Sequence, residues 1–255
     1  MPSSRIDPIA ARAFAVEVIE KLRQGGYEAV WAGGCVRDQL LDRVPLDYDV
    51  ATAARPDAVR NIFGRRNTIA VGAAFGVITV IGSKDTGNVE VATFRSDAAY
   101  VDGRHPVGVT FCGAQEDALR RDFTINGLFF DPAAGNVIDY VGGQHDLHEG
   151  VVRAIGDPIK RFEEDHLRML RAIRFSANFE FPIESDTRKA IVLLARKVES
   201  VSPERLAAEL RLMFSRQGRG EALRLLVNTN LIHPLFGNRF KRSETFLSSV
   251  SDTLD

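Results

Sequence analysis

Cysteines and long hydrophobic runs are both scarce in this sequence, and the two shortages narrow the class of protein. The sequence has two cysteines, Cys35 and Cys112, and they do not stand at the spacing of a zinc site. Neither a disulfide framework nor a zinc site is therefore expected. No apolar stretch approaches the roughly 18 residues that a membrane-spanning helix needs, and the N-terminus lacks the basic-then-apolar order of a secretory signal. We therefore expect a cytoplasmic protein that does not bind membranes.

The net charge is also small, at −1, which argues against a strongly basic nucleic-acid binder. The charges are nevertheless unevenly distributed. Residues 1–150 hold 15 basic against 20 acidic side chains, whereas residues 151–225 hold 15 against 11. An acidic first part is followed by a basic second part, and the second part suits a surface that faces phosphate groups.

The first part of the chain mixes helical and strand patterns. Apolar residues recur at helical spacing from Asp7-Pro8 to Gly25-Gly26, and a second helix is expected at 56–64. Strands are expected in short runs rich in β-branched and aromatic residues, at 27–32, 46–51, 76–82 and 88–94. These patterns predict an α+β fold with a small mixed sheet and flanking helices.

The second part of the chain has a purely helical pattern. From about residue 157 strand signals nearly vanish, and successive segments carry capping residues or helical apolar spacing. We therefore expect one domain at 1–150 and an all-helical domain at 151–240. The polar tail at 241–255 is either disordered or the point at which a longer chain was cut.

Three acidic residues fall in the expected strands. Side chains two apart on a strand point to the same face, so Asp47 and Asp49 are expected side by side. Two such carboxylates repel unless a cation neutralises them, and Mg²⁺ prefers oxygen ligands, with phosphate oxygens and waters completing its shell. Glu90, on another expected strand, is a candidate third carboxylate. A surface Asp-X-Asp pattern and an edge-strand charge are the simpler alternatives.

Gly33 and Gly34 follow one expected strand and precede a short helical stretch. Such a turn exposes backbone N–H groups to an anion, and a triphosphate could sit there with Arg37 as an added cation. The Gly-Lys-Ser/Thr ending of a P-loop is missing. The alternative is a plain tight turn, although this turn and the Asp47–Asp49 strand are separated by one short helix.

Charged residues recur every three positions in the helical part, at Asp165, Arg168, Arg171 and Arg174. On one helix this spacing places them along a single, slowly drifting face. Glu164 and Arg168 are also spaced for an i,i+4 ion pair, so a solvated helix surface is the alternative interpretation.

Five segments match the motifs of one known family in the same order. They are residues 33–52, "RRDFTING" at 120–127, "DYVGG" at 139–143, "EEDHLRMLRAIRF" at 163–175 and "SPERLAAEL" at 202–210. Together they resemble the class II tRNA nucleotidyltransferases and bacterial poly(A) polymerases of the DNA polymerase beta superfamily. The resemblance implies a nucleotidyltransferase head followed by a helical neck and the start of a body. Glycine at position 127 departs from the usual alanine.

The resemblance also implies roles for individual residues. Asp47 and Asp49 would bind catalytic Mg²⁺, and Glu90 matches the supporting third carboxylate. Positions that contact the triphosphate of the incoming nucleotide, or lie in the motif for ribose selection, are matched by Gly33, Gly34, Arg37, Arg121, Asp122 and Asn126.

In this family, Asp165 and Arg168 would act as a protein template for the incoming base. A carboxylate accepts from an exocyclic amine and a guanidinium donates to a ring nitrogen, and cytosine and adenine offer both partners. Uracil and guanine place a carbonyl where the amine should be. Arg171 and Arg174 would support this site or the phosphates.

The implied activity is CCA addition, in which the tRNA 3′-hydroxyl attacks the α-phosphate of CTP and then of ATP and releases pyrophosphate. The short segment before "RRDFTING" favours tRNA over poly(A) synthesis, and the loop at 100–106 resembles the segment that helps such enzymes switch from C to A. Poly(A) polymerase, a CC-only or A-only enzyme, and a non-catalytic RNA-binding relative remain alternatives. Family members usually continue into further helical domains, so this chain is either a fragment or a weak RNA binder on its own.

Overall fold

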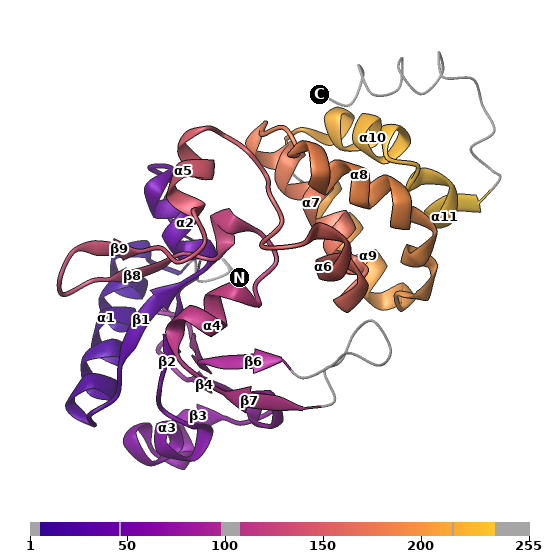
Figure 1. Cartoon of the computed structure of the whole chain (residues 1–255). Helices are drawn as coiled ribbons and strands as arrows, with labels where there is room; N and C mark the ends of the chain where they lie inside the picture. Colours follow the sequence, from indigo (N-terminus) through magenta and orange to yellow (C-terminus); the bar gives the residue numbers. More distant parts are fainter. Residues whose placement is uncertain (1–5, 46, 98–107, 216, 238–255) are drawn as a thin grey trace, which may run out of the picture. The chain divides into compact units, whose positions relative to one another are not determined.

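The computed structural model describes residues 6–45, 47–97, 108–215 and 217–237. These residues divide into two compact units, which are described separately (Figure 1). The sheet unit holds the described residues up to 97 together with 108–121 and 125–144, and the helical unit holds 122–124 and 145–237. The predictions for the loop at 100–106 and the tail at 241–255 lie outside the described residues.

A seven-stranded mixed sheet forms the centre of the sheet unit, in the order β3-β4-β5-β2-β1-β8-β9. Strands β2 and β5 run parallel, and the other neighbours run antiparallel. The strands are β1 Ala29–Ala32, β2 Asp49–Thr52, β3 Thr68–Ile69, β4 Val77–Val80, β5 Val89–Thr93, β8 Phe129–Asp131 and β9 Asn136–Ile138. A separate two-stranded sheet pairs β6 (Arg95–Asp97) with β7 (Val109–Phe111).

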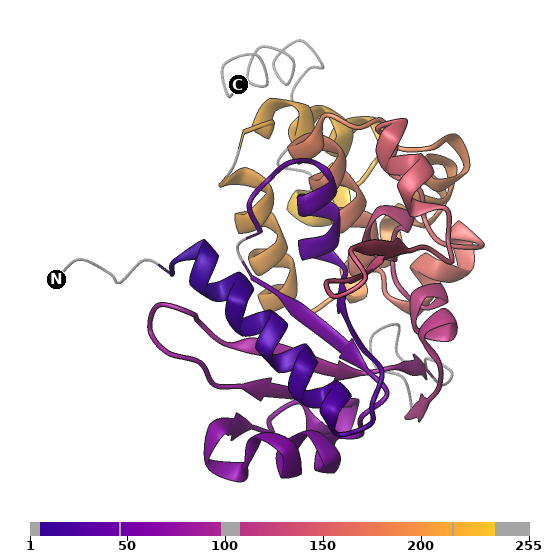
Figure 2. The same ribbon diagram turned by 90° about the vertical axis from the view of Figure 1, so that its left-hand side faces the viewer.

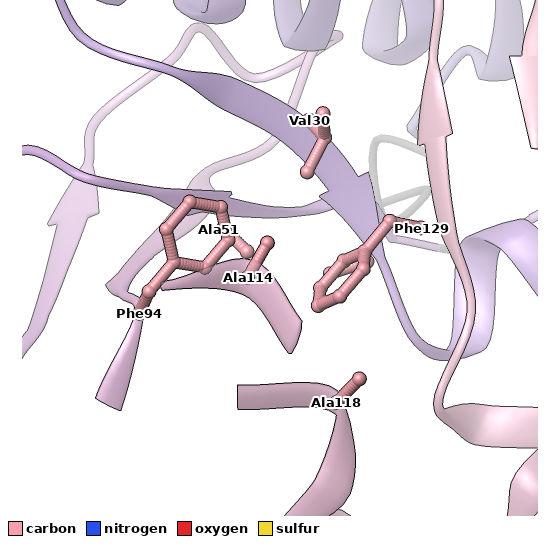
Figure 3. Close-up of a cluster of buried hydrophobic side chains, with 7 residues drawn as sticks. Val30, Ala51, Phe94, Ala114, Ala118 and Phe129 are labelled. Carbon is pink, nitrogen blue, oxygen red and sulfur yellow. The ribbon is translucent and has the colours of Figure 1, made fainter. Parts of the chain in front are cut away.

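Strand β1 is covered on both faces, as its uninterrupted apolar sequence requires. One face carries a buried cluster in which the rings of Phe94 and Phe129 meet edge to face, 5.9 Å apart (Figure 3). The opposite face carries Trp31, whose ring stacks on Phe130 at 5.6 Å. Helix α1 (Pro8–Gln24) lies across β1 and β2 (Figure 2) and places Arg12 over the Trp31 ring.

Short helices complete the sheet unit, and longer ones build the helical unit. In the sheet unit these are α2 Gly34–Leu40, α3 Pro56–Phe63 and α4 Ala114–Leu119, and α5 Gly143–His148 begins there and ends in the helical unit. The helical unit contains α6 Pro158–Glu164, α7 Leu167–Phe179, α8 Ser185–Leu194, η4 Ala195–Ser200, α9 Pro203–Phe214, α10 Arg219–Asn228 and α11 Ile232–Phe236. The predicted fold, a mixed sheet with flanking helices followed by helices, is confirmed.

The structure also bears on the two cysteines and on the scarcity of long apolar runs. Cys35 and Cys112 are both free thiols, and burial raises the pKa of Cys35 to about 12, so its thiol stays protonated. No helix in the described ranges is both long and apolar enough to cross a membrane.

Candidate active site

Asp49 and Glu90 are neighbours across the parallel pair of strands. The register of β2 and β5 places Asp49 directly beside Glu90, so both side chains leave the same face of the sheet. Asp47 lies in a bend before β2 and not in the strand, so the expected strand at 46–51 is wrong at its start. Strand β1 ends at Ala32 and the chain turns at Gly33, so β1 does not continue beside the positions before Asp49.

Negative charge accumulates at this end of the sheet. All three residues are exposed to solvent, and among the described residues none of them forms an ion pair. Partial desolvation and the charges of Asp47 and Glu90 raise the pKa of Asp49 to about 6, against the opposing influence of Arg121. Hard oxygen donors with unbalanced charge are the ligands that a divalent cation suits. In the described part of the chain no three acidic, histidine or cysteine side chains gather closely enough to hold a metal by themselves.

The predicted triphosphate residues gather around the turn that follows β1. Gly33 has φ +70°, and a Cβ atom there would lie 3.0 Å from Nη1 of Arg121. Arg37, on α2, is buried and donates from Nη1 to Oδ1 of Asn126 at 2.6 Å. Nη1 of Arg121 also lies 3.4 Å from the backbone carbonyl oxygen of Asn126, to which it donates. The structure therefore brings the glycine turn, two guanidinium groups and one amide together from two separate stretches of the chain, 33–37 and 121–126.

Asp117 holds Arg121 in place through an ion pair, a role that the sequence did not predict. The Asp117 side chain is 2 % exposed, and its Oδ2 accepts from Nη2 of Arg121 at 2.9 Å while its Oδ1 accepts from Arg120. Burial opposes ionisation of this carboxyl, but the guanidinium groups of Arg121 and Arg120 outweigh it and hold the pKa of Asp117 below its usual range. The signal was present, because Asp117 stands three and four residues before these arginines on a helix.

Asp122 belongs to the helical unit, although Arg121 before it belongs to the sheet unit. Its Oδ2 accepts from Nε of Arg171 at 2.7 Å and from Nη2 at 2.6 Å. The adjacent carboxylate raises the pKa of Arg171. Arg174 donates from Nε to Oε1 of Glu209 at 2.5 Å, and burial lowers the pKa of Arg174 despite this carboxylate. Both arginines are thus held in place by acidic partners on other segments.

Asp165 does not lie on the helix that carries the three arginines. It occupies the break between α6 and α7, with φ −150° and ψ 106°, so the expectation that all four residues line one helix face is wrong. Its Oδ1 accepts from the backbone N–H of Leu167 at 3.1 Å, and this contact helps to begin α7. Helix α7 begins at Leu167 with His166 as its N-cap, so Asp165 precedes the helix.

Arg168 is buried and makes the ion pair that its spacing predicted. Its Nη1 lies 2.5 Å from Oε2 of Glu164. The same oxygen also accepts from Nη1 of Arg161 at 2.9 Å. The same Nη1 of Arg168 donates to the backbone carbonyl of Arg161 at 2.9 Å. Because Arg168 is 9 % exposed, the alternative of a solvated surface ladder does not describe it.

Family comparisons agree with both units. Residues 29–153 match the "Poly A polymerase head domain" family, and residues 180–238 match a family described as the "probable RNA and SrmB-binding site of polymerase A". The fold and these matches define a nucleotidyltransferase head followed by a helical region.

Relatives with curated names are similar over most of the chain. The CCA-adding enzyme of Anoxybacillus flavithermus is 40 % identical over 240 residues, which is 93 % of this chain and 59 % of the relative. The CCA-adding enzyme of Bacillus subtilis is 39 % identical, over 92 % of this chain and 58 % of the relative. The crystal structure of the Bacillus stearothermophilus CCA-adding enzyme in complex with CTP superposes with TM-score 0.83 and 37 % identity, covering 93 % of this chain and 56 % of that one.

The chain belongs to the nucleotidyltransferase family that contains poly(A) polymerases and CCA-adding enzymes. It spans less than two thirds of the length of the curated relatives it matches. Membership in this family implies the use of a divalent metal ion.

Proposed function

We propose that this chain carries the catalytic part of a CCA-adding enzyme that acts on tRNA. The 3′-hydroxyl of the RNA attacks the α-phosphorus of CTP, and later of ATP, while the bond to the β-phosphate breaks and pyrophosphate leaves. The relatives named CCA-adding enzymes support this assignment, as does the structure of one of them with CTP. In this proposal the sheet unit is the catalytic head and the helical unit is the neck with the start of a body.

The observation that carries the proposal is the separation of charge within the sheet unit. Asp49 and Glu90 stand side by side, and neither forms an ion pair within the described part of the chain, while Arg37 and Arg121 converge on the turn at Gly33. A nucleoside triphosphate with a divalent cation would bind to both groups of side chains, because guanidinium groups bind its phosphates and carboxylates bind its cation.

Asp47 and Asp49 are the residues that would hold Mg²⁺, with Glu90 beside them as a supporting carboxylate. The set fits this ion, since Mg²⁺ usually takes one or two carboxylates and completes its shell with waters and substrate phosphates. When bound, Mg²⁺ would supply activation of the attacking hydroxyl and neutralisation of charge on the leaving pyrophosphate. The turn at Gly33 and Gly34, with Arg37 and Arg121, would orient the triphosphate for in-line attack.

The base would be read in the helical unit. Asp165 would accept from the exocyclic amine of cytosine or adenine, and Arg168 would donate to the ring nitrogen. Asp122 and Asn126 match the motif that the family resemblance associates with ribose selection, and Arg171 and Arg174 would support the segment that carries Asp165 and Arg168. The matched family at 180–238, described as a probable RNA-binding site, and the basic balance of residues 151–225 favour RNA as the acceptor.

Poly(A) synthesis is the second candidate, because the head domain family is named for poly(A) polymerase. One assay separates the two. The chain is incubated with Mg²⁺ and each nucleoside triphosphate in turn, with either a tRNA that lacks its CCA end or an unrelated RNA. We expect C and then A on the tRNA alone. Runs of A on both RNAs would instead support poly(A) synthesis, and ready addition of U and G would contradict the base-reading proposal. A cytoplasmic location stays a prediction of the sequence.

A further inference from the structure

The carboxylate of Asp165, which is proposed to read the base, forms an ion pair with a residue of helix α9. Nη2 of Arg205, on α9, lies 2.7 Å from Oδ2 of Asp165, 40 positions earlier in the sequence. The two side chains are 24 % and 17 % exposed, so the pair is largely shielded from water. The inference that follows rests on the proposed function, because it concerns how Asp165 distinguishes bases.

Both oxygens of Asp165 are oriented by the protein. Oδ1 accepts from the backbone N–H of Leu167 and Oδ2 accepts from Arg205. Each carboxylate oxygen accepts more than one hydrogen bond, so both keep acceptor capacity for a ligand. The helix start therefore fixes one oxygen, the Arg205 guanidinium fixes the other, and together they set the plane of the carboxylate.

Rejection of the wrong base depends on that rigidity. A carboxylate that faces the carbonyl of uracil or guanine is repelled, but a freely rotating one turns away and lets water separate the two acceptors. A fixed carboxylate cannot rotate away, so the full repulsion weakens the binding of the wrong nucleotide. Preorganised polar groups discriminate for the same reason that they stabilise transition states, since they do not rearrange on binding.

Helix α9 holds the base-reading segment through a second charged pair. Glu209 stands four residues after Arg205 on the same helix and receives Arg174 of α7 at 2.5 Å. Residues four apart share a helix face, so one face of α9 presents a cation to Asp165 and an anion to Arg174. These contacts anchor the start and the later part of the 165–174 segment to α9.

We propose that Arg205 is a positioning residue that sets the base specificity of this chain. It orients Asp165 so that nucleoside triphosphates whose bases carry an exocyclic amine are accepted and those with a carbonyl in its place are refused. Arg205 itself touches neither the base nor the phosphates in this proposal, and acts through the Asp165 carboxylate alone.

The test compares Arg205→Gln, Arg205→Lys and the unsubstituted chain by binding of CTP and UTP and by kcat/KM for their addition to a tRNA that lacks its CCA end. We expect Arg205→Gln to lower the ratio of kcat/KM for CTP to kcat/KM for UTP by about tenfold. This is the effect expected from the loss of one charge-assisted hydrogen bond. Lysine keeps the charge, so Arg205→Lys should recover part of the ratio. Arg211→Gln removes the same charge from an exposed position of α9 and should leave the ratio unchanged.

Two results would overturn the inference in distinguishable ways. If Arg205→Gln weakens CTP and UTP equally, or weakens only the use of the tRNA, Arg205 supports the fold or the RNA and not base selection. If the unsubstituted chain itself binds and adds all four nucleotides alike, the proposed function fails, and the role of Arg205 fails with it.

Discussion

The acidic side chains of the two units differ in what stands beside them. In the helical unit, Asp122, Asp165 and Glu209 are each paired with an arginine from a distant segment. At the strand ends of the sheet unit, Asp47, Asp49 and Glu90 are exposed, and within the described residues none of them forms an ion pair. Charges that are already matched have a fixed geometry, which suits recognition. Unmatched charges attract a mobile cation, which suits chemistry.

Removal of an unmatched carboxylate should have the largest effect. Asp49→Ala should lower nucleotide addition about a thousandfold, since a metal ligand supports several kcal/mol of charge stabilisation. Thermal stability should hold or rise, because the repulsion by Asp47 and Glu90 that raises the pKa of Asp49 disappears. Addition is followed with labelled CTP and ATP, and unfolding is measured on the same samples. Asp85→Ala, at an exposed loop position, is the control, and full activity in Asp49→Ala would refute the metal assignment.

The next largest effect should come from a matched carboxylate. Asp165→Asn presents an amide that donates to a carbonyl, so the preference for CTP over UTP should fall about a hundredfold. Competition between the two nucleotides in one reaction measures the ratio directly. Asp186→Asn removes an exposed aspartate that pairs with Lys189 on α8 and should preserve the preference. An undiminished preference in Asp165→Asn would assign base selection to other residues.

Asp117 tests whether the sheet unit also relies on matched charge. Asp117→Asn weakens the buried contacts with Arg120 and Arg121 and should cost about 2 kcal/mol of unfolding free energy at pH 7. The pKa of Asp117 is lowered in the folded chain, so this stabilisation is present above the unfolded pKa of about 3.9 and is lost as the pH falls through the folded value. Denaturant unfolding at pH 7, 5 and 3.5 should show the difference between the two proteins shrinking below about pH 4. A difference independent of pH would mean that the carboxylate charge is not what stabilises the site.

The smallest expected effect concerns the turn beside Arg121. Gly33→Ala places a Cβ atom 3.0 Å from Nη1 of Arg121 at a residue with φ +70°. It should cost about 1 kcal/mol of stability and raise KM for the nucleotide about fivefold with little change in kcat, because ground-state binding of the triphosphate is affected. Gly135→Ala is a matched control, since its φ is +68° but no atom lies within 4 Å of the added Cβ. Equal effects of the two substitutions on KM would show that backbone strain alone is responsible.

Local patterns explain how much of the molecule the sequence predicts. The helix at Pro8–Gln24 has its cap, Asp7, and its glycine stop, Gly25, directly beside its two ends. The glycine turn and the aspartates lie within 17 residues of one another. The break at Asp165 was missed because helical spacing continues across it. At this break the Asp165 side chain accepts from the backbone N–H of Leu167 and pairs with Arg205, a residue 40 positions away that no local pattern indicates.

Asp49 and Glu90 meet across the parallel strand pair, and this has a consequence for folding. Parallel strands cannot be joined by a tight hairpin, and these two residues are separated by 40 others in the chain. Contacts of such long sequence separation form late, because the intervening loop must lose its conformational freedom first. A chain that has formed its helices but not yet this sheet therefore does not bring Asp49 beside Glu90, the pairing on which the proposed metal site depends.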